Sequence, residues 1–298
     1  MKFKLVILSA MFGLMTTESA AMAAAGRYAR SLFFSPVGGV AAVVGAIGSY
    51  DSYRHNRDFV RACESSETDL SWQQQRVIRD IFRSHGVEDI LIVDAEKIAS
   101  KGLKHCPSLD TLKTIAFPGK NILIIPWAER TILEKGFFEI KDSFGRVVAR
   151  FVRKGVEGGL HHEATHAQHA DGIEAVGHSV AKSIPFSLMV GQGTYVGGGR
   201  GKLGALAAGV VAAATTYLTM PYAVAWRQRQ IEKRCDLNIP TSELARATAR
   251  DMYLEGELLK EIGDLSTFSK DPLAEYYPTN ERVDYLLEHA NELEKQGK

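Results

Sequence analysis

The pattern that constrains this chain most is His162-Glu163-Ala164-Thr165-His166, in which two histidines enclose a glutamate. On a helix, residues four apart lie on one face, so both imidazoles can bind the same metal ion. Glu163 would point about 100° round the helix from His162, where it can reach a metal-bound water without binding the metal. The pattern therefore predicts a helix here that carries a catalytic site with one zinc ion per chain.

The residues alone leave the third zinc ligand open. A catalytic zinc ion takes three protein ligands and keeps its fourth position for water. The metzincin spacing is absent, because the chain has His169 and Gly172 where that spacing needs glycine and histidine. Glu232 can complete a His2Glu site, and Asp236, one turn on, could orient a ligand histidine. A carboxylate in a charged helix is usually solvated, however, so His169 stays an alternative ligand.

Composition excludes several classes of partner. With 36 Lys and Arg against 35 Asp and Glu, the net charge of +1 creates no basic field for nucleic acid, so no nucleic-acid partner is expected. The three cysteines form no CxxC pair, which argues against a thiolate zinc site. The sequence leaves the oligomeric state open.

Two apolar segments occupy the N-terminus. Residues 1–25 begin with two lysines, continue with an apolar run and end in small residues, which is typical of a signal peptide or signal anchor. Residues 26–60 contain an uncharged stretch from Ser31 to Tyr50 that is long enough to span a bilayer. Its glycines and Pro36 leave a buried hairpin or an interfacial segment as the alternative.

A further apolar region, residues 183–226, interrupts the chain after the histidine pattern. Two uncharged stretches, Ser183 to Gly199 and Leu203 to Trp226, are separated only by Arg200 and Lys202. They predict a hydrophobic helical hairpin inserted into a domain of residues 61–298. These segments favour a membrane protein, of a bacterial inner membrane or an organelle membrane, with the lipid bilayer as a partner; the side that bears the site stays open.

The remaining chain predicts an α+β fold that is mostly helical, with a small sheet. Helical periodicity covers residues 71–85, and two further helices follow Thr241 and Pro278. Short β-branched runs at 89–94 and 121–125 predict strands. Because Pro126 ends the second run and cannot donate to a ladder, we expect an edge strand there.

Three motifs around the histidine pattern resemble those of one peptidase family. They are Ile115-Ala116-Phe117-Pro118-Gly119-Lys120 before the strand, Glu232-Lys233-Arg234-Cys235-Asp236, and Tyr276-Tyr277-Pro278-Thr279-Asn280-Glu281-Arg282-Val283. Their order, around the histidine pattern and the apolar hairpin, resembles the integral-membrane gluzincin peptidases. That family includes the HtpX heat-shock protease, the CAAX prenyl protease type I and the mitochondrial inner-membrane quality-control protease.

The resemblance implies a zincin-like metallopeptidase domain and a role for each motif. Glu232 would be the third zinc ligand, Asp236 its support, and Arg282 would tie the last helix to the site. Tyr276 replaces the family histidine and would donate to a developing oxyanion. The strand residues would form the edge along which an extended polypeptide substrate lies, namely Asn121, Ile122, Leu123 and Ile124.

The expected function is that of a membrane-associated zinc endopeptidase in protein quality control or processing. Glu163 would act as general base toward a zinc-activated water. The alternative is a catalytically idle zinc-binding membrane scaffold or chaperone. Retention of Glu163 favours the enzyme, because a structural zinc site has no use for a base and fills all four positions with protein ligands.

Overall fold

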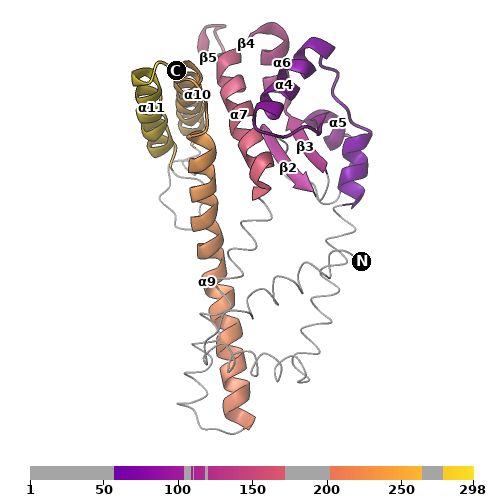
Figure 1. Ribbon diagram of the computed structural model, residues 1–298, viewed down its shortest axis with the longest axis vertical. Coiled ribbons are helices and arrows are strands. Elements are labelled where there is room, and N and C mark those ends of the chain that lie inside the picture. Colours follow the sequence, from indigo (N-terminus) through magenta and orange to yellow (C-terminus); the bar gives the residue numbers. More distant parts are fainter. Residues whose placement is uncertain (1–56, 104–108, 110, 118–119, 172–201, 264–277) are drawn as a thin grey trace. The chain divides into compact units, whose positions relative to one another are not determined.

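The computed structural model describes residues 57–103, 109, 111–117, 120–171, 202–263 and 278–298 (Figure 1). The chain divides into two compact units, Met1–Arg61 and Ala62–Lys298. All elements considered below belong to the second unit, which is mostly helical and contains two small sheets.

A three-stranded sheet forms one part of this unit. Its order is β1 (Ile90–Asp94), β3 (Lys120–Ile125) and β2 (Lys113–Phe117), with β1 parallel and β2 antiparallel to β3. The isoleucines of β3 are fully buried, as expected for a β-branched strand covered on both faces.

The expected edge strand at Asn121, Ile122, Leu123 and Ile124 is therefore wrong, because β3 is the central strand. Pro126 lies just outside the strand, at the N-cap of helix α6 (Trp127–Lys135), so it removes no hydrogen bond from the ladder. Within the described residues, the edge strand on that side of the sheet is β2 instead.

The main core lies where the sheet meets helices α4 (Trp72–Ser84) and α7 (Arg153–His169). A capping box between Ser71 and Gln74 fixes the start of α4, and the helix buries Ile78 and Phe82. The short helix α5 (Ala95–Ala99) follows β1 and buries Ile98. Strands β4 (Phe137–Lys141) and β5 (Val147–Val152) form an antiparallel hairpin directly before α7.

Glycine lets helix α10 (Ser242–Glu261) pack closely against α7. A Cβ atom on Gly158 would lie 2.0 Å from Thr248 Oγ1, so only a residue without a side chain allows this approach. Helix α11 (Thr279–Lys295) packs against α10 in turn, around a second core of buried residues: Ile239, Ala245, Ala249, Tyr285, Leu286 and Ala290.

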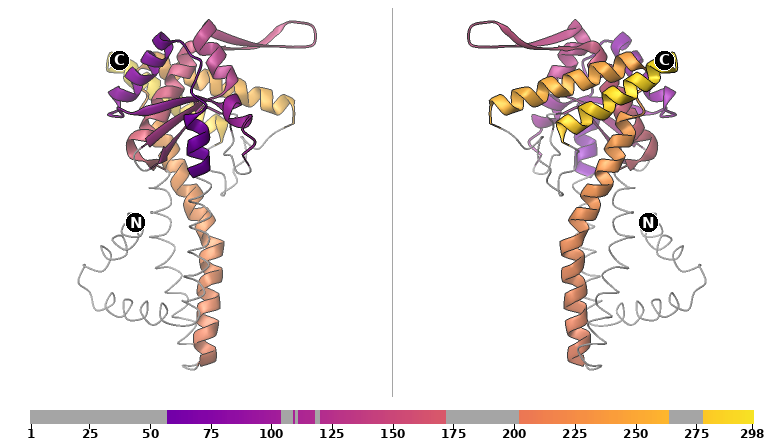
Figure 2. Two further views of the ribbon diagram at one scale, coloured as in Figure 1. Left: turned by 90° about the vertical axis from the view of Figure 1, so that its right-hand side faces the viewer. Right: turned by 90° about the vertical axis from the view of Figure 1, so that its left-hand side faces the viewer.

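Helix α9 (Lys202–Asp236) runs to the neighbourhood of α7 and brings its C-terminal end beside that helix (Figures 1 and 2). It covers the second arm of the expected hydrophobic hairpin, Leu203 to Trp226. In the part of the chain that the structure describes, no helix combines the length and the hydrophobicity that crossing a bilayer requires. The arm is uncharged, but it is rich in alanine, glycine and threonine, which contribute little apolar surface.

For the described residues, the prediction of membrane-spanning elements, and with it the membrane location, is wrong on this finding, whereas the bilayer as a partner stays a prediction. The prediction rested on the absence of charge, which does not by itself measure hydrophobicity. The first arm, Ser183 to Gly199, lies outside the described residues, as do the segment 1–25 and all but the last few residues of 26–60.

Candidate metal centre

The two histidines of the pattern lie side by side on α7. This helix is continuous from Arg153 to His169, so His162 and His166 share one face. Their Nε2 atoms are 3.0 Å apart, and only 8% of the His162 surface is exposed. Two imidazole nitrogens thus converge on one point in the protein interior.

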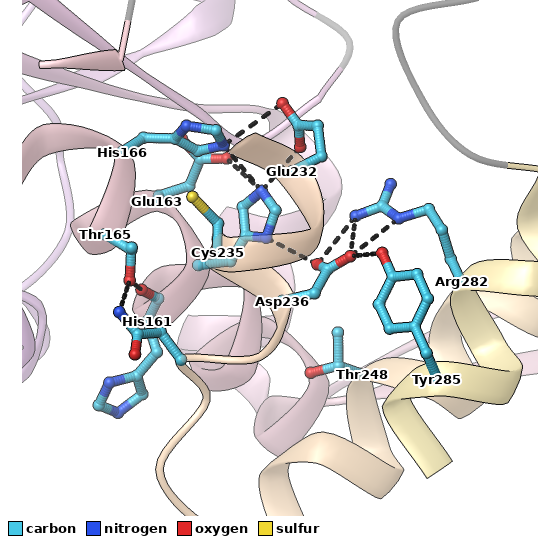
Figure 3. A network of polar contacts seen from close by, with 12 residues as sticks. His161, Glu163, Thr165, His166, Glu232, Cys235, Asp236, Thr248, Arg282 and Tyr285 are labelled. Carbon is cyan, nitrogen blue, oxygen red and sulfur yellow. Dashed lines mark hydrogen bonds and ion pairs between the residues drawn. The ribbon is translucent and has the colours of Figure 1, made fainter. Parts of the chain in front are cut away.

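Glu232 of α9 completes this group. Its Oε2 atom lies 3.1 Å from His162 Nε2, and its Oε1 atom lies 3.5 Å from His166 Nε2 (Figure 3). The carboxylate is buried, with 2% of the residue exposed. Gln228 Nε2 donates to Oε1 at 2.7 Å, whereas the approach of His162 Nε2 to the buried Oε2 does not have hydrogen-bond geometry. The three residues form a buried group that could hold a metal ion, and an ion would satisfy that remaining oxygen.

Each imidazole has a carboxylate at its other nitrogen. His162 Nδ1 lies 2.7 Å from Asp236 Oδ1, and His166 Nδ1 lies 2.9 Å from Asp171 Oδ2. A carboxylate at Nδ1 favours the tautomer with the proton on Nδ1, which leaves the Nε2 lone pair for a metal. Both ligand rings are therefore oriented toward the point where Glu232 also arrives.

The electrostatics of the group are those of a cation site. Burial opposes protonation of His162, but the Asp236 carboxylate outweighs it and raises the pKa of His162 to about 9. Burial alone would raise the pKa of Glu232, yet the two imidazoles hold it well below its usual range. In the protein as described, protons on the histidines balance the buried carboxylates, and a metal ion would take over that role with release of protons.

Glu163 lies beside this group rather than in it. Its Oε1 atom is 4.0 Å from His162 Nε2, and its Oε2 atom accepts a hydrogen bond from the Thr114 backbone N–H on β2. That bond holds the carboxylate against the sheet. The arrangement separates the ligand positions from a carboxylate available for proton transfer.

Helix α11 supports the site through Asp236, which is fully buried. Arg282 contacts both carboxylate oxygens, with Nη2 2.9 Å from Oδ1 and Nε 3.0 Å from Oδ2. The Tyr285 hydroxyl also donates to Asp236 (Figure 3). The last helix of the chain thereby fixes the carboxylate that fixes His162.

From the sequence, Asp171 was only an alternative third ligand should Glu232 be misassigned, and Tyr285 had no expected role. Tyr285 lies three residues after Arg282 on the same face of α11, a signal that its spacing could have supplied. Asp171 reaches His166 because Ala170, with φ 50°, adopts a left-handed conformation that ends α7. Asp171 also pairs with Arg234 and lies 3.6 Å from Cys235 Sγ, so it belongs to the surroundings of His166.

The other candidates fall outside the site. His169 is exposed, so the structure gives no support to it as third ligand. Tyr276 lies outside the described residues, and its expected contact with an oxyanion stays a prediction. Of the predicted edge residues, Ile122, Leu123 and Ile124 are buried, Asn121 is half-buried, and none of them lines the cleft at the site.

The site opens into a cleft of about 1420 Å³, whose lining includes His162, Glu163 and Glu232. Pockets for small ligands usually measure roughly 300–1,000 Å³, so this cleft has room for a larger molecule. Lys113, Thr114 and Ala116 of the β2 edge line it, and the other walls come from the β4–β5 hairpin and α10.

Comparisons with protein-family models, with curated proteins and with solved structures gave no match to this chain. The expected zincin-like fold is therefore not identified, and the resemblance to the gluzincin peptidases stays a prediction from sequence motifs.

Proposed function

We propose that the protein is a zinc-dependent endopeptidase in which His162, His166 and Glu232 bind the metal and Glu163 is the general base. The observation that carries this proposal is the convergence of two imidazole nitrogens and one carboxylate within 4.8 Å of one another. Two histidines with one glutamate are a common ligand set of catalytic zinc.

Bound zinc would lower the pKa of its water toward about 7 and polarise the substrate carbonyl. The chain's own residues account for the remaining requirements. Glu163 would take the proton of the attacking water and pass it to the leaving amine. Thr114 holds that carboxylate in place through its backbone N–H, and Asp236 and Asp171 hold the two ligand rings.

The position of Glu163 favours this enzyme over the alternative, an idle zinc-binding scaffold or chaperone. A purely structural zinc site uses four protein ligands and closes itself to water. Here three candidate ligands face a cleft, and a carboxylate that is not a ligand lies next to them.

The edge of β2 is the better candidate for substrate contact than β3. Within the described residues β2 pairs only with β3, and on its other edge the Thr114 N–H donates to Glu163. That edge lines the cleft and includes Thr114, which contacts Glu163. An extended polypeptide that pairs with β2 would pass directly beside the candidate base.

The test compares two variants on the same helix. Glu163→Gln should lower cleavage of an unfolded protein substrate by about 10²- to 10⁴-fold while the zinc content stays near one per chain. Glu157→Gln, which changes a glutamate of α7 paired with Arg153 instead, is the control and should cleave normally. Purified protein that binds no zinc after reconstitution, or a Glu163→Gln variant with normal activity, would sink the proposal.

A further inference from the structure

The cleft continues well beyond the candidate metal centre, between the β4–β5 hairpin and α10. We call this part the hairpin groove. It is lined by apolar side chains on both walls, with Ile140, Val148 and Phe151 on the hairpin, Met252 and Leu259 on α10, and Ile262 at the C-cap of α10. Figure 2 shows the hairpin and the C-terminal end of α10 projecting to the same side of the unit.

Some of these side chains are strongly exposed. Val148 is 46% exposed and Ile262 is 78% exposed. Exposed apolar surface gathered along a cleft is uncommon on a protein without a partner, because its burial from water is favourable. The groove therefore has the surface of a binding site for apolar side chains.

The length of the groove fits an extended chain. The part of α10 from Thr248, which packs on Gly158 near the metal centre, to Glu261 is about 20 Å long at about 1.5 Å per residue. An extended polypeptide covers that length in about six residues at about 3.3 Å each. A substrate that lies in the groove would thus extend about six residues from the bond to be cleaved.

Acidic residues of the groove also bear on which kinds of segment it can bind. Glu129, Asp251 and Glu255 line the same cleft, and for none of them does the described part of the chain supply a salt bridge. Each has a raised pKa, for which burial is the largest cause. These carboxyls disfavour acidic segments only where they are ionised, whereas apolar segments are accepted in either protonation state.

We infer that the hairpin groove binds an unfolded, apolar segment of the polypeptide substrate, remote from the cleaved bond. The inference rests on the proposed function for the nature of the occupant, and the continuity of the groove with the metal centre in one cleft supports it. It makes the protein selective for unfolded chains, because a folded domain does not present about six extended apolar residues.

Two matched pairs of variants test the groove. Val147 and Val148 are neighbours on β5 with nearly equal exposure, 48% and 46%, but only Val148 lines the cleft. Ile262 at the C-cap of α10 lines the cleft, and the exposed Tyr253 of α10 does not. Val148→Lys and Ile262→Lys are the test variants, with Val147→Lys and Tyr253→Lys as controls.

The first measurement uses two peptides with the same cleavage site, one extended by about three residues on each side and one by about ten, so that only the second reaches about 20 Å from the cleaved bond. In the test variants, the kcat/KM of the long peptide relative to the short one should fall about tenfold, as expected for loss of one partly buried aliphatic contact. Both controls should keep the wild-type ratio. Equal ratios in Val147→Lys and Val148→Lys would overturn the inference.

The second measurement needs no cleavage. Fluorescence anisotropy of the labelled long peptide with metal-free Glu163→Gln should show binding that Val148→Lys weakens about tenfold and Val147→Lys does not. If this difference appears but zinc-loaded protein cleaves no peptide, the groove stands and the proposed function fails. If cleavage proceeds and Val148→Lys binds like Val147→Lys, the groove fails and the function stands.

Discussion

Asp171 Oδ2 lies 2.9 Å from His166 Nδ1, although Asp171 follows the end of the helix that carries His166. The left-handed Ala170 ends α7 and turns Asp171 back beneath the ring. His166 thus has the same kind of support that Asp236 gives His162, from the opposite end of the site. The sequence does not reveal this contact, because on a continuous helix Asp171, five residues after His166, would lie on another face.

Removal of this support should weaken metal binding without removing a ligand. Asp171→Ala is expected to lower zinc affinity by about 10- to 100-fold, because His166 loses the partner that fixes its tautomer. Competition with a chromogenic chelator measures the dissociation constant. His169→Ala changes an exposed histidine of the same helix and is the control. Equal affinities of the two variants would remove Asp171 from the role assigned to it.

The tyrosine on α11 offers a second test of the supporting contacts. Tyr285→Phe deletes the hydroxyl that donates to the buried Asp236, and a buried group deprived of its partner costs about 1–3 kcal/mol. Urea unfolding should show a loss in this range, together with weaker zinc binding. Tyr253→Phe, at an exposed position of α10, should change neither quantity. A stability loss with unchanged zinc affinity would limit Tyr285 to a structural role.

Close packing of α7 on α10 predicts opposite outcomes at two neighbouring glycines. Gly158→Ala would place its Cβ 3.2 Å from the Leu244 carbonyl oxygen as well as against Thr248, so we expect a loss of about 1–3 kcal/mol from overpacking. Gly159→Ala meets only Leu112 Cδ2 at 3.3 Å, the end of a flexible side chain. Its gain in helix propensity of roughly 0.5–1 kcal/mol should offset that contact. Thermal unfolding of both variants decides the matter.

Glu129 predicts a pH dependence of stability. Burial raises its pKa from 4.5 to about 7, so the folded state binds more protons than the unfolded state between these values. Its contribution to stability is complete below about pH 4.5 and is lost as the pH rises through about 7. Glu129→Gln mimics the protonated form, so the variant should exceed the wild type in stability by about 1–2 kcal/mol at pH 8. At pH 4 the two should be equal, and a constant difference across this range would contradict the assignment.

The sequence predicted the parts of the site that depend on local spacing. His162, Glu163 and His166 share a helix, and their relation follows from its period alone. The approach of Glu232 to the histidines came from a resemblance between motifs, since the spacing of residues far apart says nothing about tertiary contact. The structure brings these residues together.

The order of the strands and the presence of membrane-spanning helices were harder to predict from the sequence. The pairing of β3 on both edges depends on β1 and β2, and a proline at the end of a strand does not reveal its neighbours. The prediction of a spanning helix from Leu203 to Trp226 rested on an absence of charge, which does not by itself establish a membrane span. Asp171 depended on one left-handed residue, an alanine, which carries no sequence signal for that conformation.

The contacts of Asp236 with α11 determine when, during translation, the support of His162 can form. A chain leaving the ribosome exposes both histidines of α7 long before Arg282 and Tyr285 have been made. Domains fold as their last required segment becomes available. The support of His162 is therefore complete only once α11 has been made, and a chain that stops before α11 keeps Asp236 without the Arg282 and Tyr285 contacts that fix it.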